Sequence, residues 1–163
     1  AVRGLDPNTK MNPPLRAETD RAALIEALAD GAISCVATDH APHRADEKEQ
    51  PFQQAPFGVI GLETAFPAVY THLVEPGLVA LETVVERMTA GPAAAFGLVP
   101  PRLAVGAPAD LALWDLAAAF EVRPPYHSRS HNSCFAGSLL RGVCMLTVAG
   151  GAVAHRAVRA VAG

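Results

Sequence analysis

The chain is built around a short apolar run that ends in a carboxylate and two imidazoles. The run Ile33-Ser34-Cys35-Val36-Ala37 contains β-branched residues and follows a turn signal, so it predicts a buried strand. Asp39, His40 and His43 come directly after it, where Pro42 forces a turn because its ring fixes φ and removes a donor. Acid and imidazole groups at the carboxyl end of a strand are where α/β enzymes place their chemistry.

A helix precedes this strand and completes one αβ unit of a parallel sheet. Apolar residues recur at helical spacing through residues 18–31, with Thr19 as the expected N-cap and Gly31 as the stop. Further upstream, a strand end near Thr9–Asn12 is expected to run into a loop, because the prolines after Asn12 favour extended backbone. The sequence therefore predicts the α/β class.

The remainder of the chain divides into a helical part and a β part. The polar stretch 44–56 is longer than most connections, so it predicts either a functional lid or a solvated charge run. Helices are expected after it at 62–73, 81–88 and 92–96. From Leu103 onward the pattern predicts short antiparallel strands at 109–115, 143–149 and 152–155, with a tight turn at Gly150-Gly151.

Composition excludes several classes of function. The 163 residues carry a net charge of −3 without a basic block, which disfavours nucleic acid and anionic membranes as partners. No apolar stretch approaches the roughly 18 residues of a membrane-spanning helix. The three cysteines lack metal-site spacing and favour buried thiols in a reducing, cytoplasmic setting.

Three segments in order resemble dihydroorotases of the cyclic amidohydrolase superfamily. They are MNPPLR at 11–16, ATDHAPH at 37–43 and FGVIGLE at 57–63. The C-terminal stretches VGAPADLALWDL and NSCFAGSLLRGVCMLTVAGGAVAH resemble the β-sandwich segment that follows the barrel in these enzymes. The resemblance extends over nearly the whole chain, and the order and spacing of the segments make it specific.

The resemblance implies the C-terminal part of a (β/α)8 barrel followed by a small β-sandwich segment. Residues 1–102 would supply the last two barrel strands and the helices after them, and residues 103–163 the sandwich segment. A complete barrel needs about 250 residues, so the chain is expected to be a portion of such an enzyme. The family's His-x-His metal pair is absent from the sequence, and its only lysines are Lys10 and Lys48. The chain alone is therefore expected to be inactive.

The resemblance also implies a reaction and a set of site residues. Dihydroorotases interconvert dihydroorotate and N-carbamoyl-aspartate in pyrimidine biosynthesis, with Zn²⁺ (two ions per complete site) activating water. Asp39 would be both a metal ligand and the catalytic acid/base. Asn12 and His43 would bind the substrate, and Phe57 and Gly58 would contact its ring through their backbone. His40 is expected either to orient the loop or to support the site indirectly.

Three alternatives remain open on the sequence alone. A hydantoinase or allantoinase would share the fold and metals, although His43 and the Asn-Pro-Pro of 12–14 favour dihydroorotase. A non-catalytic dihydroorotase-like scaffold for aspartate transcarbamoylase is the second, although the presence of Asp39 and His43 argues against loss of the site. A small binding domain is the third. Expected partners are the small-molecule substrate, further copies of the protein or aspartate transcarbamoylase.

Overall fold

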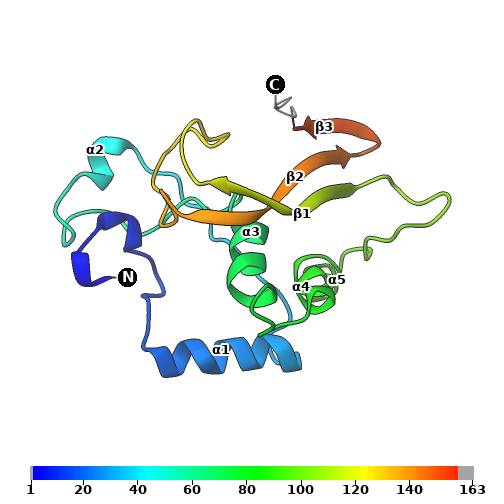
Figure 1. Cartoon of the computed structure of the whole chain (residues 1–163), viewed down its shortest axis with the longest axis horizontal. Coiled ribbons are helices and arrows are strands. Elements are labelled where there is room, and N and C mark those ends of the chain that lie inside the picture. The colour runs from blue at the N-terminus through cyan, green and yellow to red at the C-terminus, as the bar shows by residue number, and fades with distance from the viewer. Residues whose placement is uncertain (1, 158–163) are drawn as a thin grey trace.

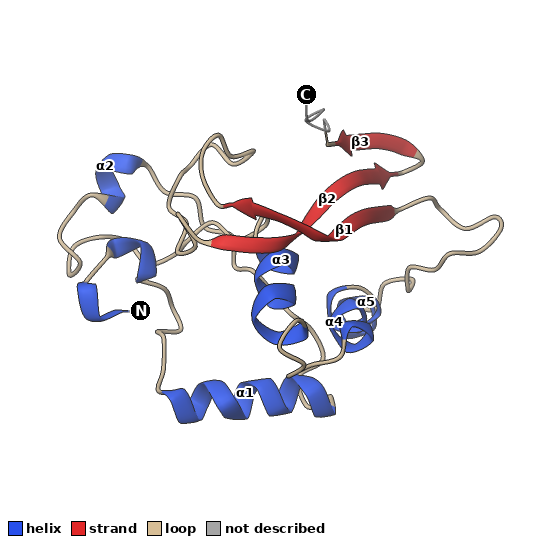
Figure 2. Cartoon of the chain, viewed as in Figure 1, coloured by secondary structure: helices blue, strands red, loops and turns tan. Residues whose placement is uncertain are grey.

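The structure, a computed structural model, describes residues 2–157 and places the helices of 18–30, 65–69, 81–88 and 90–95 on one side of a three-stranded antiparallel sheet (Figures 1 and 2). Two 3-10 turns open the chain at Val2–Gly4 and Pro7–Thr9. The helices are α1 (Glu18–Asp30), α2 (Ala45–Lys48), α3 (Ala65–Val69), a π-helical turn (Tyr70–Val74), α4 (Leu81–Met88) and α5 (Ala90–Ala95). Over these residues no helix combines the length and the apolar character needed to cross a bilayer.

Helix α1 confirms the predicted helix over 18–31, but its N-cap lies two residues earlier than expected. Ala17 occupies the N-cap position, and its backbone N–H donates to the Asp20 carboxylate at 3.1 Å. At the other end, Gly31 adopts φ 96°, a left-handed conformation that glycine takes without a Cβ penalty. The cap therefore depends on the acid in the first turn rather than on the hydroxyl of Thr19.

The C-terminal third forms the sheet that the β pattern predicts. Strand β1 (Leu111–Glu121) pairs with β2 (Leu139–Ala149), which pairs with β3 (Ala152–Arg156), all antiparallel. Gly150 and Gly151 join β2 to β3 with φ values of 56° and 80°, so the tight turn that requires two positive φ angles is confirmed. Residues 158–163 of the predicted β segment lie outside the described residues.

The sheet and the helices are joined through helix α3. Ala68 on α3 is buried against Val122 and Leu140, which belong to the sheet region. A second apolar cluster lies between the helices, where Leu28, Val79 and Val84 are buried. In Figure 1, α3 accordingly lies between the sheet and α1. The described chain thus has two small cores rather than one large one.

Within residues 2–157, the two segments expected as barrel strands form no sheet ladder. Residues 33–38 run extended but carry no sheet ladder, and Ala37 is exposed rather than buried. The Val36 N–H donates to the carbonyl of Arg87 at 2.9 Å, and Arg87 lies in the last turn of α4 rather than in a neighbouring strand. Of the strand end expected near Thr9–Asn12, Thr9 belongs to the 3-10 turn Pro7–Thr9, and residues 10–12 are in no strand. The physical reason is that a strand needs a second strand beside it, and within residues 2–157 none runs along 33–38.

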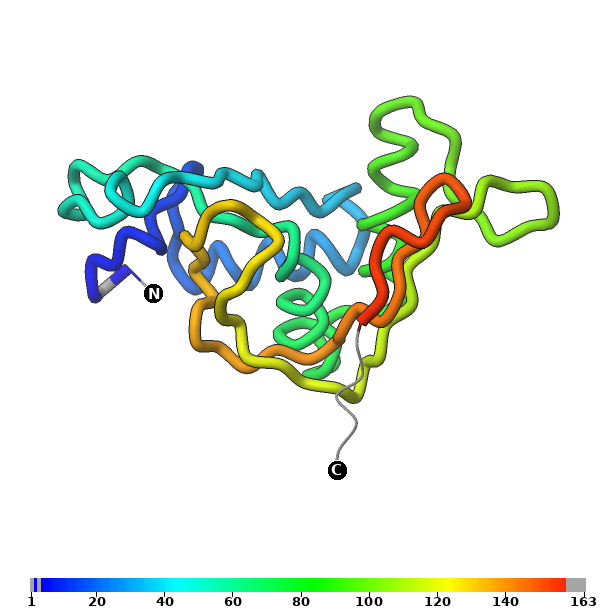
Figure 3. The backbone as a smooth tube through the Cα atoms, turned by 90° about the horizontal axis from the view of Figure 1, so that it is seen from above, coloured from blue at the N-terminus to red at the C-terminus, as the bar shows by residue number. Residues whose placement is uncertain are grey.

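The fold therefore confirms the helical and antiparallel parts of the predicted architecture, while the described residues contain neither a closed barrel nor a second sheet. Large apolar side chains are exposed along the segment between α5 and β1, for example Val99 at 84% and Leu103 at 89%. This segment projects from the body of the molecule in both views of the backbone (Figures 1 and 3).

Gly91 gives the first testable prediction, on stability. A Cβ at this position would lie 2.0 Å from the carbonyl oxygen of Ser34, so the backbone of α5 and of 33–36 would have to separate. Gly91→Ala should lower the free energy of unfolding by about 3 kcal/mol, the upper end for overpacking, although alanine normally favours helices. Gly4→Ala, with nothing within 4 Å of its Cβ, is the control. Equal melting temperatures of the two variants would contradict this packing.

Candidate functional site

Three segments that are distant in sequence meet at one end of the molecule. Ala41 N–H donates to Val59 O at 3.0 Å, and His40 pairs with Val59 in a single parallel bridge. Gly58 N–H donates to Lys10 O at 2.9 Å. The segments 10–12, 39–43 and 57–60 therefore lie side by side, and they contain all five residues that the sequence analysis selected.

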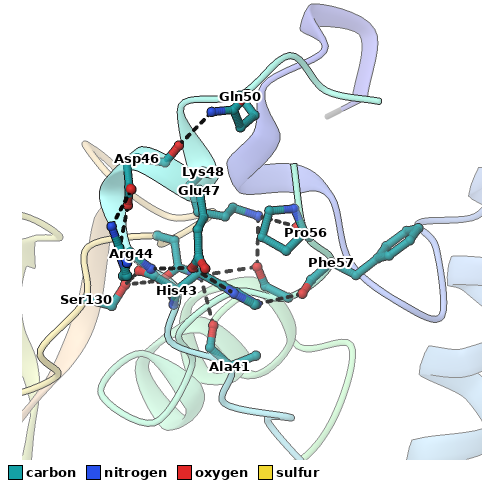
Figure 4. A network of polar contacts seen from close by, with 12 residues as sticks. Ala41, His43, Arg44, Asp46, Glu47, Lys48, Gln50, Pro56, Phe57 and Ser130 are labelled. Carbon is teal, nitrogen blue, oxygen red and sulfur yellow. Dashed lines mark hydrogen bonds and ion pairs between the residues drawn. The ribbon is translucent and has the colours of Figure 1, made fainter. Parts of the chain in front are cut away.

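His43 is held on both sides of its ring (Figure 4). Its Nε2 lies 2.8 Å from Phe57 O, and because a carbonyl can only accept, Nε2 carries a proton and donates. Its Nδ1 faces a carboxylate oxygen of Glu47, on α2, at 3.7 Å. A substrate carboxylate would therefore accept the Nε2–H hydrogen bond in place of Phe57 O.

Gly58 is the position at which the backbone requires glycine. Its φ is 116°, and a Cβ would lie 2.6 Å from Ala41 Cβ and 3.2 Å from His43 Nε2. The space left by the missing Cβ is thus filled by the protein's own side chains. The expected contact between the Gly58 backbone and a substrate ring stays a prediction, for the side of Gly58 that does not face Ala41 and His43.

Phe57 combines an exposed ring with an available donor. Phe57 is 55% exposed, and Lys10 Nζ lies 4.6 Å from the centroid of its ring, within cation–π range. The Phe57 N–H donates to no atom of the described residues, whereas the Gly58 N–H is already used by Lys10 O. Of the two backbone amides predicted to contact a substrate ring, Phe57 offers the available N–H.

Asp39 and Asn12 lie at the open side of the three segments. Asp39 is exposed, and its carboxylate has no hydrogen bond or ion pair with another described residue. It adopts φ 44°, an uncommon left-handed conformation for a residue with a side chain, and such strained positions cluster at functional sites. Asn12 is exposed as well, two residues beyond the Lys10 carbonyl that binds Gly58. The structure places both on segments of the site, and among the described residues no hydrogen bond or ion pair joins either side chain to His43.

His40 orients the loop, which was one of its two expected roles. Its Nδ1 accepts from Gly61 N–H at 3.1 Å and from Leu62 N–H at 3.3 Å. Nδ1 is therefore unprotonated and fixes the start of the segment that leads into α3. This bond ties residue 40 to the backbone 21 residues later.

The sequence analysis missed four residues that hold the site together. Lys48 and Lys10 are buried, and each donates to two main-chain carbonyls of residues 53–58 at 2.7–3.0 Å. Ser130 and Asn132 are also buried and bond to the segments 41–43 and 58. Lys48 lies within a run of charged residues and the other three show no periodic pattern, so no local signal distinguishes them.

Lys48 gives a prediction for alkaline pH. Burial, and after it the positive charge of Lys10, lower the pKa of Lys48 below its ordinary 10.5. Between the lowered folded pKa and 10.5, the unfolded chain binds more protons than the folded chain, so this group makes the free energy of unfolding rise with pH. Burial raises the pKa of Tyr126 and Cys134, which act in the opposite direction.

The difference between wild type and Lys48→Met isolates the lysine from these two groups. Stability relative to Lys48→Met should increase as the pH rises toward 10.5, because only the wild type loses the charge that burial disfavours. Denaturant unfolding at a series of alkaline pH values measures this difference. A constant or falling difference would mean that the ammonium group is not destabilised by burial.

A complete metal centre is not formed by the described residues. Among residues 2–157, no three His, Cys, Asp or Glu side chains gather closely enough to hold one metal ion. Asp39 is exposed and free of internal partners, which suits a single ligand to a metal whose other ligands lie elsewhere. This chain by itself does not fit the two-zinc site that the resemblance implies.

Comparison with known proteins defines the class. The amidohydrolase family profile matches residues 8–153, and the chain belongs to that family. Within it, the chain is dihydroorotase-like: it is 49% identical over 160 residues to the dihydroorotases of Bacillus caldolyticus and Geobacillus kaustophilus. These matches cover 98% of this chain but only 38% and 37% of the two relatives, so the chain spans a little over a third of their length.

Solved structures of related enzymes share the fold. An L-hydantoinase from Arthrobacter aurescens superimposes with a TM-score of 0.83 and 32% identity, over 95% of this chain and 36% of that enzyme. A D-hydantoinase gives a TM-score of 0.82 and 29% identity, over 92% of this chain and 34% of that enzyme. The described fold therefore corresponds to part of a hydantoinase structure.

Proposed function

We propose that this chain is the C-terminal portion of a dihydroorotase, which reversibly hydrolyses the cyclic amide of dihydroorotate to N-carbamoyl-aspartate in pyrimidine biosynthesis. The observation that carries the proposal is the 49% identity to dihydroorotases along 98% of the chain, against 32% and 29% to the hydantoinases. The fold is shared by both groups, so it supports the family and leaves the substrate to the site.

Asp39 is proposed to move the proton. Hydrolysis of an amide requires a proton to leave the attacking water and another to reach the departing nitrogen. The Asp39 carboxylate, exposed and without an internal partner, can accept the first proton and deliver it to the nitrogen. Zinc, held by Asp39 together with ligands outside this chain, would lower the pKa of water and polarise the carbonyl.

The other site residues are proposed to bind the substrate. A carboxylate on the substrate needs N–H donors, and His43 Nε2 and the Asn12 amide can supply them. The Phe57 N–H is the backbone donor available for a ring carbonyl. Gly58 acts through its shape, because its main chain approaches Ala41 and His43 too closely for any side chain.

The architecture of the complete protein is part of the same proposal. Residues 1–102 would complete a (β/α)8 barrel with strands from outside this chain, and 103–163 would belong to a β-sandwich segment. A barrel strand from outside this chain would give residues 33–38 the neighbouring strand that they lack among the described residues. Assembly with further copies or with aspartate transcarbamoylase in the cytoplasm belongs to this proposal as well.

An assay of the complete protein with zinc tests the proposal. Hydrolysis should be measured for dihydroorotate, hydantoin and allantoin, and cyclisation for N-carbamoyl-aspartate. We expect turnover of dihydroorotate and N-carbamoyl-aspartate only. Preferred turnover of hydantoin or allantoin would assign the protein to those enzymes instead, and an inactive protein that binds aspartate transcarbamoylase would identify a scaffold.

A further inference from the structure

Asn132 lies in the loop between β1 and β2, far along the chain from the site motifs, yet its side chain contacts two of the three site segments. Its Nδ2 donates to Ala41 O at 2.9 Å and to Gly58 O at 3.2 Å. Its Oδ1 accepts from His43 N–H at 3.3 Å and from the hydroxyl of Ser130. One buried amide therefore connects the segment that carries His43 to the segment that carries Gly58.

The backbone around Asn132 strengthens the same connection. Ile60 N–H donates to Asn132 O at 3.0 Å, so the main chain of Asn132 is also bonded to the end of the segment 57–60. The hydroxyl of Ser130 also lies within hydrogen-bond distance of the His43 carbonyl, so its single proton can be donated either to that oxygen or to Asn132 Oδ1. Asn132 is 4% exposed, so few of these bonds can be replaced by water when the amide is removed.

We propose that Asn132 is a positioning residue: its amide holds Ala41, His43 and Gly58 in the geometry that aims the His43 imidazole at the substrate. The contacts account for each half of the amide. The NH₂ group joins the Ala41 carbonyl to the Gly58 carbonyl, which also accepts from Lys48, and the oxygen fixes the backbone N–H of His43. The imidazole then meets Phe57 O at 2.8 Å.

Removal of the Asn132 amide should disturb the segments 39–43 and 57–60 more than the rest of the fold. Asn132→Ala leaves the Ala41 carbonyl and the His43 N–H without their side-chain partner and removes one of the two donors to the Gly58 carbonyl. Asn132→Asp keeps the volume and the acceptor oxygen but loses both donors, so it should act at least as strongly as alanine. Ser133→Ala is the matched control, because Ser133 is equally buried but its hydroxyl bonds only within its own loop, to Phe135 N–H.

Hydrogen exchange of the complete protein, followed by mass spectrometry, tests the positioning role without any reference to activity. We expect faster amide exchange in peptides covering 39–43 and 57–60 for both Asn132 variants, with unchanged exchange in α1 and in β1–β3. Ser133→Ala should leave all of these peptides at the wild-type rate. Unchanged exchange at 39–43 and 57–60, or an increase spread evenly over the chain, would overturn the proposal.

Kinetics supply a second test, which rests on the proposed function. Because His43 is proposed to bind a carboxylate remote from the bond that breaks, both Asn132 variants should raise KM for dihydroorotate by about tenfold or more. They should lower kcat far less. A loss confined to kcat would overturn the positioning role, whereas wild-type protein without dihydroorotase activity but with the expected exchange pattern would overturn only the proposed function.

Discussion

Asp39→Asn is expected to lower kcat for dihydroorotate by roughly 10²–10⁴-fold, the usual loss on removal of an acid/base group. Asparagine has the shape of aspartate but no useful basicity near neutral pH, so it cannot accept or deliver the proton. The substitution should not disturb the fold, because the Asp39 carboxylate is exposed and makes no bond to another described residue. The left-handed φ of 44° is also tolerated by asparagine.

The control for Asp39→Asn is the metal content. If Asp39 were a metal ligand and nothing more, added zinc would restore turnover. Measurement of kcat at saturating zinc, with bound metal determined on the same sample, separates the two roles. Turnover near the wild-type level with full metal occupancy would remove Asp39 from proton transfer.

Gly58→Ala is expected to reduce kcat/KM by roughly 10²-fold or more, the loss that a displacement of about 1 Å can cause in an active site. The new Cβ would lie 2.6 Å from Ala41 Cβ and 3.2 Å from His43 Nε2, so the His43 segment must move away from Phe57. The φ of 116° adds backbone strain to this clash.

Gly77→Ala separates the clash from the strain. Gly77 has a positive φ of 76° like Gly58, but a Cβ there would meet nothing within 4 Å. Gly77→Ala should therefore lower the free energy of unfolding and leave kcat/KM unchanged. Steady-state kinetics of both variants make the comparison, and equal losses in activity would show that strain, not displacement of His43, causes the effect.

Features that depend on local chemistry could be predicted from the sequence. The end of α1 at Gly31 and the hairpin turn at Gly150-Gly151 follow from positive φ angles that glycine adopts freely. The run 33–38 forms a strand only where another strand supplies its hydrogen bonds, and none does so within residues 2–157. Local pattern does not reveal whether that neighbour is present.

In the candidate site, too, some residues could be predicted from local sequence and others could not. Asp39, His43, Phe57 and Gly58 occur in motifs, and the structure brings their segments together. Asn132 lies 89 residues beyond His43, and nothing in its local sequence indicates the hydrogen bonds that it makes. Lys48 was predicted, with its charged neighbours, to lie in a lid or a solvated run, but it is only 6% exposed because the carbonyls of Pro56 and Gly58 solvate its ammonium group.

The central claim is that this site recognises the carboxylate of dihydroorotate through His43. Dihydrouracil has the same ring without that carboxylate, so the ratio of kcat/KM for dihydroorotate to that for dihydrouracil measures the recognition directly. In the complete protein, we expect the ratio to be large for wild type and to fall by about tenfold or more in His43→Ala. A wild-type ratio near one, or a ratio that His43→Ala leaves unchanged, would contradict the account.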